Sequence, residues 1–358
     1  MNPLRMIRSA AIRSRFARLL LLILAFTAAY SPVRAAIPPL FRVQAGLSVN
    51  NISLIINDLD PLSQQIGNYY QNARKVPAEN LIHIRFETGQ TVISPAKFQE
   101  IMKIVRNRTP ESVQAYVLTW NTPYRVGCMS VTTAFAAGYN ESFCAKGCNP
   151  TLTSPYYNSK SGAPYSDYGW RPTIMLAGRS FESVTRLIDR GVASDHTYPI
   201  GKAYLLSTSD KARNSRAHWF NPIKQAFKNL WDVEVIQADS IRNRSDVMFY
   251  FTGLTRVPDI RSNRFLPGAL ADHLTSTGGK LTDSRQMSIL EWLEAGATGS
   301  YGTVVEPCNF PQKFPNPGIV MSNYLRGSTL IEAYWKSVAW PGQGIFVGEP
   351  LAKPFGGP

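Results

Sequence analysis

The sequence predicts an α/β protein with a mostly parallel sheet and helices on both of its faces. Short apolar runs alternate with segments whose apolar residues recur at helical spacing, and this order repeats in the second half of the chain. A chain of 358 residues with 44% hydrophobic residues can bury a large core. Because ligands of such sheets bind beyond the carboxyl ends of the strands, we expect functional residues at strand ends.

Residues 1–35 have the pattern of a secretory signal peptide. Five arginines precede the apolar run Leu19–Ala29, and Val33-Arg34-Ala35 supplies a small-x-small cleavage pattern. The apolar run is too short for a comfortable membrane span, and no later segment has eighteen consecutive apolar residues. We therefore expect an exported protein, periplasmic or extracellular, whose residues 36–358 form a single domain without a transmembrane segment.

The charge of the chain does not favour a nucleic-acid-binding function. Removal of residues 1–35, with six arginines and no acidic residue, lowers the formal net charge from +14 to +8. The remaining basic residues are scattered and do not form the stripe or module that nucleic acid requires. The sequence thus predicts no nucleic-acid partner, and the nature of an envelope or surface ligand stays open.

The first half of the domain contains three predicted strands and two predicted helices. The strands are the apolar runs 53–57, 81–86 and 115–120. The helices are a segment in which Ile66, Tyr69, Tyr70 and Ala73 recur at helical spacing, and residues 95–106. Residues 121–171 are rich in Gly, Ser, Tyr, Asn and Pro and hold three of the four cysteines, which predicts a long loop or insertion.

The second half resumes the alternation of strands and helices. Predicted strands cover 173–178, 202–207, 233–237, 247–253 and 302–306, and predicted helices cover 180–192 and 219–230. The stretch PGALADHLTSTGG, residues 267–279, lies between a Pro-Gly and a Gly-Gly pair. It is either a functional segment or a short polar helix that contains His273.

The four cysteines predict two disulfides, since an exported protein folds in an oxidising compartment. Four cysteines allow three pairings. The sequence favours Cys144–Cys148 as a local clip and Cys128–Cys308 as a long-range bridge, because both cysteines of the second pair closely follow strand-like runs. The spacing of CAKGC and the lack of a second such pair argue against a zinc site.

Candidate binding residues follow several of the predicted strands. Asn121, Tyr124 and Arg125 follow the strand that ends at Trp120, and Thr252 ends the most apolar strand; Asp272 and Lys313 are the remaining candidates. The glycines Gly296, Gly299 and Gly302 precede a strand, whereas a dinucleotide-binding fingerprint follows one. Asp272, His273 and Glu306 could supply metal ligands, but their spacing gives no helical pair such as HExxH, so no metal site is predicted, and no other motif implies a cofactor.

His273 is the strongest catalytic candidate. An imidazole with a pKa near neutrality suits a general base, which a carboxylate such as Glu306 would orient, with Ser276 or Thr275 as the nucleophile. The alternative is a structural histidine, since the residues from Asp272 to Ser276 are too close in sequence to form a triad among themselves.

Several motifs resemble those of a family of exported bacterial proteins that occurs in genomes with the PEP-CTERM/exosortase sorting system. They are TWNTPYRV, PGALADHLTSTGG, EWLEAGATGSYGTVVEP, KFPNP and IFVGEPLAKPF, which span nearly all of the mature chain. The family has no established activity. The layout from VMFYFTG to GSYGTVV is also similar to the caspase-like fold of gingipain-type cysteine peptidases, which implies a caspase-like architecture of one or two lobes.

The catalytic residues of those peptidases have no counterpart in this chain. The resemblance places their histidine at Thr252-Gly253 and their cysteine at Asp272-His273. The sequence therefore favours a non-catalytic envelope or surface binding protein that uses the crevice and the insertion. The alternative is an envelope hydrolase that acts through His273 and Glu306 and is not a cysteine peptidase.

Overall fold

The computed structural model describes residues 46–357, which fall within one compact unit. The predicted signal peptide lies outside the described residues. No helix among residues 46–357 combines the length and the apolar character needed to cross a bilayer.

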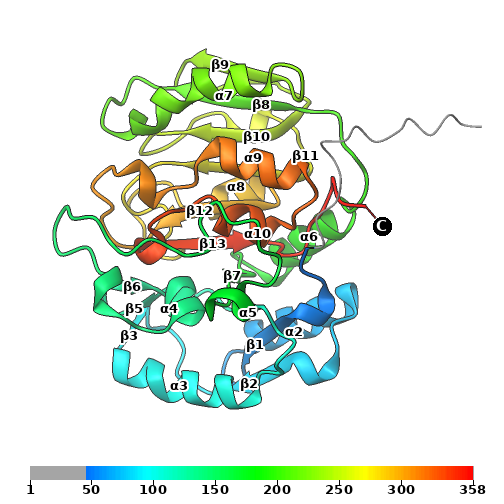
Figure 1. Cartoon of the computed structure of the whole chain (residues 1–358), viewed down its shortest axis with the longest axis vertical. Coiled ribbons are helices and arrows are strands. Elements are labelled where there is room, and N and C mark those ends of the chain that lie inside the picture. The colour runs from blue at the N-terminus through cyan, green and yellow to red at the C-terminus, as the bar shows by residue number, and fades with distance from the viewer. Residues whose placement is uncertain (1–45, 358) are drawn as a thin grey trace, which may run out of the picture. The chain divides into compact units, whose positions relative to one another are not determined.

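A ten-stranded sheet runs through the molecule, with helices on both of its faces (Figure 1). The strand order is β2-β1-β4-β7-β13-β12-β11-β10-β8-β9. The strands are β1 (Ile52–Asn57), β2 (Leu81–Ile84), β4 (Ala115–Leu118), β7 (Thr173–Met175), β8 (Lys202–Ser207), β9 (Val233–Gln237), β10 (Val247–Thr252), β11 (Phe265–His273), β12 (Gly299–Thr303) and β13 (Gly344–Gly348). All adjacent pairs but one are parallel, so the predicted mostly parallel α/β sheet is confirmed.

The single antiparallel pair reverses the direction of half of the sheet. The last strand, β13, is antiparallel to β12 but parallel to β7. Strands β2, β1, β4, β7 and β13 therefore run one way, and β12, β11, β10, β8 and β9 run the other way. The carboxyl ends of the two halves lie at opposite edges of the sheet, which the sequence did not predict.

Several helices begin where the sequence supplies a cap or a proline. The side chain of Asp60 accepts a hydrogen bond from the Leu62 amide at the start of α2, and that of Ser94 accepts one from the Lys97 amide at the start of α3. The helices of the two halves are α2 (Pro61–Arg74), α3 (Pro95–Arg108), α6 (Phe181–Val192), α7 (Phe220–Phe227), α8 (Leu290–Ala295), α9 (Pro317–Leu325) and α10 (Leu330–Trp335). Their apolar faces pack on the sheet and leave its central strands buried.

The insertion 121–171 is more regular than the predicted loop. It contains β5 (Arg125–Val126), β6 (Met129–Ser130), α4 (Val131–Ala137) and α5 (Pro164–Tyr168). The strand β3 (Val92–Ile93) completes a small sheet of order β3-β5-β6. Helix α4 is buried from Val131 to Ala136 against β7 and β13, so this part of the insertion belongs to the core.

The stretch around His273 forms the end of a strand, not a polar helix. Strand β11 pairs with β10 in parallel, but the register shifts between Val247 and Phe249, opposite Pro267 and Gly268. Proline has no ladder amide, and Gly268 adopts a φ of 87°. This irregularity in the middle of a buried strand removes the simple period that would have identified β11 in the sequence.

The predicted disulfide pairing is wrong, although all four cysteines are paired. The bridges are Cys128–Cys144 and Cys148–Cys308, with Cα–Cα distances of 5.4 and 5.3 Å. Both distances suit a disulfide. The fold brings Cys144 back beside β6 through the turn after α4, so the local clip forms between Cys128 and Cys144, and Cys148 is left for the long-range bridge.

Candidate functional site

His273 lies fully buried at the end of β11, and both of its ring nitrogens are engaged. The Trp292 Nε1 group donates to His273 Nδ1 over 2.9 Å, and His273 Nε2 donates to the backbone oxygen of Met287 over 3.1 Å. Burial lowers the pKa of His273 to about 3. The neutral imidazole therefore connects β11 to α8 and has no nitrogen left to accept a proton from a substrate.

Asp272 forms a buried ion pair with Arg216. The Arg216 Nη2 group donates to Asp272 Oδ1 over 2.6 Å, and the side chains of Arg216 and Asp272 are 1% and 0% exposed, respectively. Burial raises the pKa of Asp272 to about 6, against the opposing effect of the guanidinium. The same guanidinium donates to the backbone oxygens of Thr252 and Pro315, so it joins the ends of β10 and β11 to the segment before α9.

The segment that carries Arg216 closes the crevice beyond β10 and β11. This segment, η5 (Arg213–Trp219), lies against Gly253, where an added Cβ atom would overlap the backbone oxygen of Arg213. The Arg213 side chain also donates to the Thr275 hydroxyl over 3.0 Å. Thr252 is itself buried, and its hydroxyl has no hydrogen-bond partner among the described residues. The space beyond these strand ends is therefore filled by the chain itself.

Sequence reasoning missed Arg216, although the sequence contains a signal for it. Arg216 continues the apolar stripe of α7, which consists of Phe220, Ile223 and Phe227, at spacings of four, three and four residues. An arginine in line with a buried stripe indicates a buried partner of opposite charge, because an unpaired buried guanidinium is too costly. Its partner, Asp272, was already a candidate site residue.

Ser276 and Glu306 do not complete a catalytic arrangement with His273. The Glu306 side chain is exposed and accepts a hydrogen bond from the Cys308 amide over 2.8 Å. The backbone oxygen of Ser276 accepts from the Thr303 hydroxyl over 3.0 Å. Since both ring nitrogens of His273 have other partners, neither residue is hydrogen-bonded to the imidazole.

Lys313 is a buried cation rather than an exposed binding residue. It is 0% exposed, and its Nζ lies 5.1 Å from the centroid of the Phe310 ring without a hydrogen-bond partner among the described residues. Burial lowers the pKa of this amine to about 8. The Lys313 backbone oxygen accepts a hydrogen bond from the Tyr301 hydroxyl over 2.6 Å, which fixes this loop on β12.

The residues after β4 lie on the other half of the sheet. The Asn121 amide is bonded in both directions to the backbone of Gly178, and the buried Tyr124 donates to Asp283. Burial and the Asp283 carboxylate raise the pKa of Tyr124 to about 12. Because β4 and β11 run in opposite directions, the end of β4 and the end of β11 lie at opposite edges of the sheet. Tyr124 and Asn121 nevertheless reach the 281–291 segment, which follows β11: Tyr124 through its hydrogen bond to Asp283, and Asn121 in a shared cavity.

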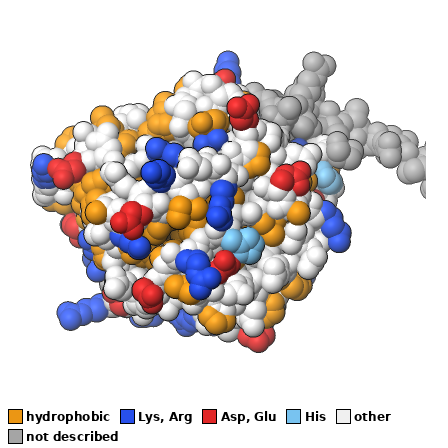
Figure 2. Space-filling model, turned by 90° about the horizontal axis from the view of Figure 1, so that it is seen from below, with side chains coloured by type: hydrophobic (Ala, Val, Ile, Leu, Met, Phe, Trp, Pro, Cys, Tyr) orange, Lys and Arg blue, Asp and Glu red, His pale blue; other side chains and the backbone are white. Residues whose placement is uncertain are grey.

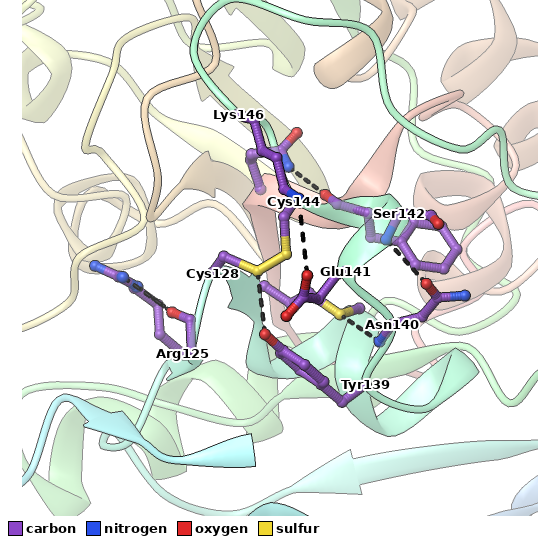
Figure 3. Close-up of a disulfide and its surroundings, with 12 residues drawn as sticks. Arg125, Cys128, Tyr139, Asn140, Glu141, Ser142, Cys144 and Lys146 are labelled. Atoms are coloured by element: carbon purple, nitrogen blue, oxygen red, sulfur yellow. Dashed lines mark hydrogen bonds and ion pairs between the residues drawn. A yellow bond between two sulfur atoms is a disulfide. The ribbon is translucent and has the colours of Figure 1, made fainter.

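Arg125 stands beside the first disulfide without contacting it. Figure 3 shows its guanidinium pointing away from the Cys128–Cys144 bridge, where it donates to the backbone oxygen of Gly127 over 2.9 Å. Asn121 lines a separate polar cavity of about 390 Å³ together with Arg179, Arg256 and residues of the 281–291 segment. The candidate residues after β4 are therefore divided between turns and this cavity.

The surface of the molecule carries no patch of a single charge on the face shown in Figure 2. Lys and Arg side chains lie across that face with Asp and Glu side chains between them. Within residues 46–357 there is also no group of three or more His, Cys, Asp or Glu side chains arranged to hold a metal ion. A cavity between α3 and the insertion is lined by cations that form no ion pair with a described residue.

This cavity is about 530 Å³ in volume, and a second one of about 560 Å³ adjoins it. Both are lined by Met102 and Arg106 of α3 and by Ala137 at the end of α4. The first also contains Arg171, and the second contains Lys103. Together they form one groove, which we call the α3 groove. Comparison of the chain with family models, with curated proteins and with solved structures finds no match.

Proposed function

We propose that this protein is an exported, non-catalytic binding protein whose contacts with its ligand involve the insertion 121–171. The observation that carries the proposal is the closed strand-end crevice. The segment η5 fills the space beyond β10 and β11, and His273 is fully buried with both nitrogens engaged. A general base must be able to reach the proton that it removes, and this histidine faces only protein atoms.

The composition of the closed crevice supports the same conclusion. A peptidase of the gingipain type needs an activated thiolate beside a histidine. Here Asp272 stands at the end of β11 and is neutralised by Arg216, while Thr252 lies opposite His273 in the register of β10 and β11. Every cysteine among the described residues is in a disulfide, so no thiol is available.

Export is supported by the two disulfides. Such bridges persist in oxidising compartments and are rare in the reducing cytosol. The bridge Cys148–Cys308 closes a loop with a sequence separation of 160 residues and ties the insertion to the segment after β12. Together with the arginine-rich, apolar pattern of residues 1–35, it favours a protein that folds after translocation.

The test separates catalysis from binding. Oxidised wild-type protein and the variants His273→Gln and Glu306→Gln are incubated with a fluorogenic peptide library, with labelled acidic and neutral polysaccharides, and with purified cell-envelope polymer. We expect no turnover above the blank, and we expect the wild type to sediment with the insoluble envelope polymer. Turnover that both substitutions abolish in folded protein would establish the hydrolase alternative. Absence of both turnover and sedimentation would overturn the binding proposal.

A further inference from the structure

We infer that the α3 groove binds the carboxylate groups of an acidic polysaccharide, with Arg171 as the anchoring residue. This inference rests on the proposed binding function and assigns it a site and a class of ligand. The groove runs between α3 and the part of the insertion that contains α4, Tyr139, Tyr165 and Arg171.

Arg171 is held in place but keeps part of its guanidinium free. The residue is 8% exposed, its Nε donates to the Val113 backbone oxygen over 2.9 Å, and its Cζ lies 3.2 Å from the centroid of the Tyr165 ring. A second ring, that of Tyr116, lies 5.4 Å from the same atom. No described residue forms a hydrogen bond or ion pair with Nη1 or Nη2. A buried guanidinium whose terminal nitrogens lack partners and border a cavity is suited to a carboxylate.

The backbone on both sides of Arg171 fixes the direction of this side chain. Its amide donates to the Ala136 oxygen over 3.1 Å, and its own oxygen accepts from the Thr173 hydroxyl over 2.9 Å. The preceding Trp170 packs on Phe143 and on Trp335. The guanidinium is therefore preorganised, so a ligand would not have to restrict a free arginine side chain.

The charge of the groove matches a polymer with repeated carboxylates. Lys103 and Arg106 lie along α3 at a spacing of three residues, and neither forms an ion pair with a described residue. Glu111 is the single acidic residue in the lining of the two cavities. Three cations against one carboxylate favour an anionic ligand that extends beyond a single group.

The uncharged residues of the groove favour a sugar over a peptide. The second cavity is lined by the amides Gln99, Asn107 and Asn140 and by Tyr139, side chains that can both donate to and accept from sugar hydroxyls. The groove lies between a helix and the insertion, and no unpaired strand edge borders it for a peptide to extend. An acidic peptide is therefore the competing ligand that the experiment must exclude.

Binding is measured by titration calorimetry on the oxidised protein with an oligouronate, with a neutral oligosaccharide of the same length, with inorganic phosphate and with oligoglutamate. We expect the oligouronate alone to bind measurably. We expect Arg171→Lys to weaken this binding at least about tenfold, because lysine keeps the charge but loses the two-pronged, stacked geometry. Arg106→Gln, at an exposed position, should weaken this binding several-fold. Binding by this variant should also depend less on salt concentration than binding by the wild type.

The matched control is Arg186→Gln, which removes one exposed cation on α6, outside the groove. It should leave the affinity within about twofold of the wild type, and melting curves verify that each variant is folded. Stronger binding of oligoglutamate or of phosphate than of oligouronate overturns the assignment of ligand. Oligouronate binding that neither Arg171→Lys nor Arg106→Gln weakens overturns the assignment of site. If the variants sediment with envelope polymer as the wild type does, the assignment of the ligand site to the α3 groove is wrong, but the proposed binding function stands.

Discussion

Lowering the pH from about 7.5 to about 5 should destabilise this protein through one histidine. In the unfolded chain His273 titrates with the ordinary histidine pKa of 6.5, whereas burial lowers the pKa in the folded protein to about 3. A folded-state pKa below the unfolded value means that only the unfolded chain takes up the proton in this range. The free energy of unfolding therefore falls as the pH drops below 6.5.

The magnitude follows from the difference between the two pKa values. Each pH unit below the unfolded pKa costs about 1.4 kcal/mol until the folded protein is protonated as well. Between pH 7.5 and pH 5 the contribution of His273 amounts to about 2 kcal/mol. The Trp292 indole and the Met287 oxygen stabilise the neutral ring, in which Nδ1 accepts and Nε2 donates.

The assay compares urea unfolding of the wild type and of His273→Gln at several pH values under oxidising conditions. Glutamine does not titrate, and it cannot reproduce the packing and both hydrogen bonds of the imidazole. The variant should therefore be less stable than the wild type at pH 7.5. The stability gap should shrink by about 2 kcal/mol at pH 5, because only the wild type loses this contribution. The control is His83→Gln, whose side chain is 45% exposed beside Asp58. A gap for His273→Gln that stays constant from pH 7.5 to pH 5 would refute a buried, neutral His273.

The remaining predictions concern the buried ion pair and the disulfides. Asp272→Asn should lower the free energy of unfolding by about 3–5 kcal/mol, because Arg216 would keep a buried charge without its carboxylate. The double variant Arg216→Met, Asp272→Leu should cost less than Asp272→Asn alone, and a double-mutant cycle with additive effects would contradict the pairing. Peptide mapping without reductant should recover Cys128–Cys144 and Cys148–Cys308, and alkylation of the native protein should label no cysteine. Cys308→Ser should lower the free energy of unfolding by up to about 5 kcal/mol. Cys128→Ser should lower it by up to about 3 kcal/mol, since the loop closed by Cys128–Cys144 is shorter. Recovery of Cys144–Cys148 would show that the structure has the wrong bridges.

The fold class could be predicted from the sequence because each half of the chain carries its own periodicity. The apolar run of β1 and the helical spacing of Ile66 and Tyr70 in α2 depend on neighbours within about ten residues. The same holds for α6, which begins at the cap supplied by Ser180. Such local patterns predict the structure correctly because the apolar residues that form the pattern are the ones that become buried against the sheet.

The site could not be predicted in the same way, because it depends on which strands become neighbours. The expectation of one shared crevice assumed that the carboxyl ends of all strands lie at one edge of the sheet. Because β13 lies between β7 and β12 and is antiparallel to β12, the carboxyl ends of β4 and β11 lie at opposite edges. Strand order is a property of long-range pairing, and a strand of five residues carries no mark of its partner or its direction.

The sequence alone marked His273 and Asp272 as residues near a strand end, and the tertiary structure alone decided which partners they contact there. Arg216 is separated from Asp272 by 56 residues, and Trp292 lies 19 residues beyond His273. Only the folded sheet brings these side chains together and removes water from around them. Burial keeps the His273 imidazole neutral and leaves the Asp272 carboxylate paired with Arg216. Both side chains therefore have a structural role, because a charge is stable in the interior only beside its partner.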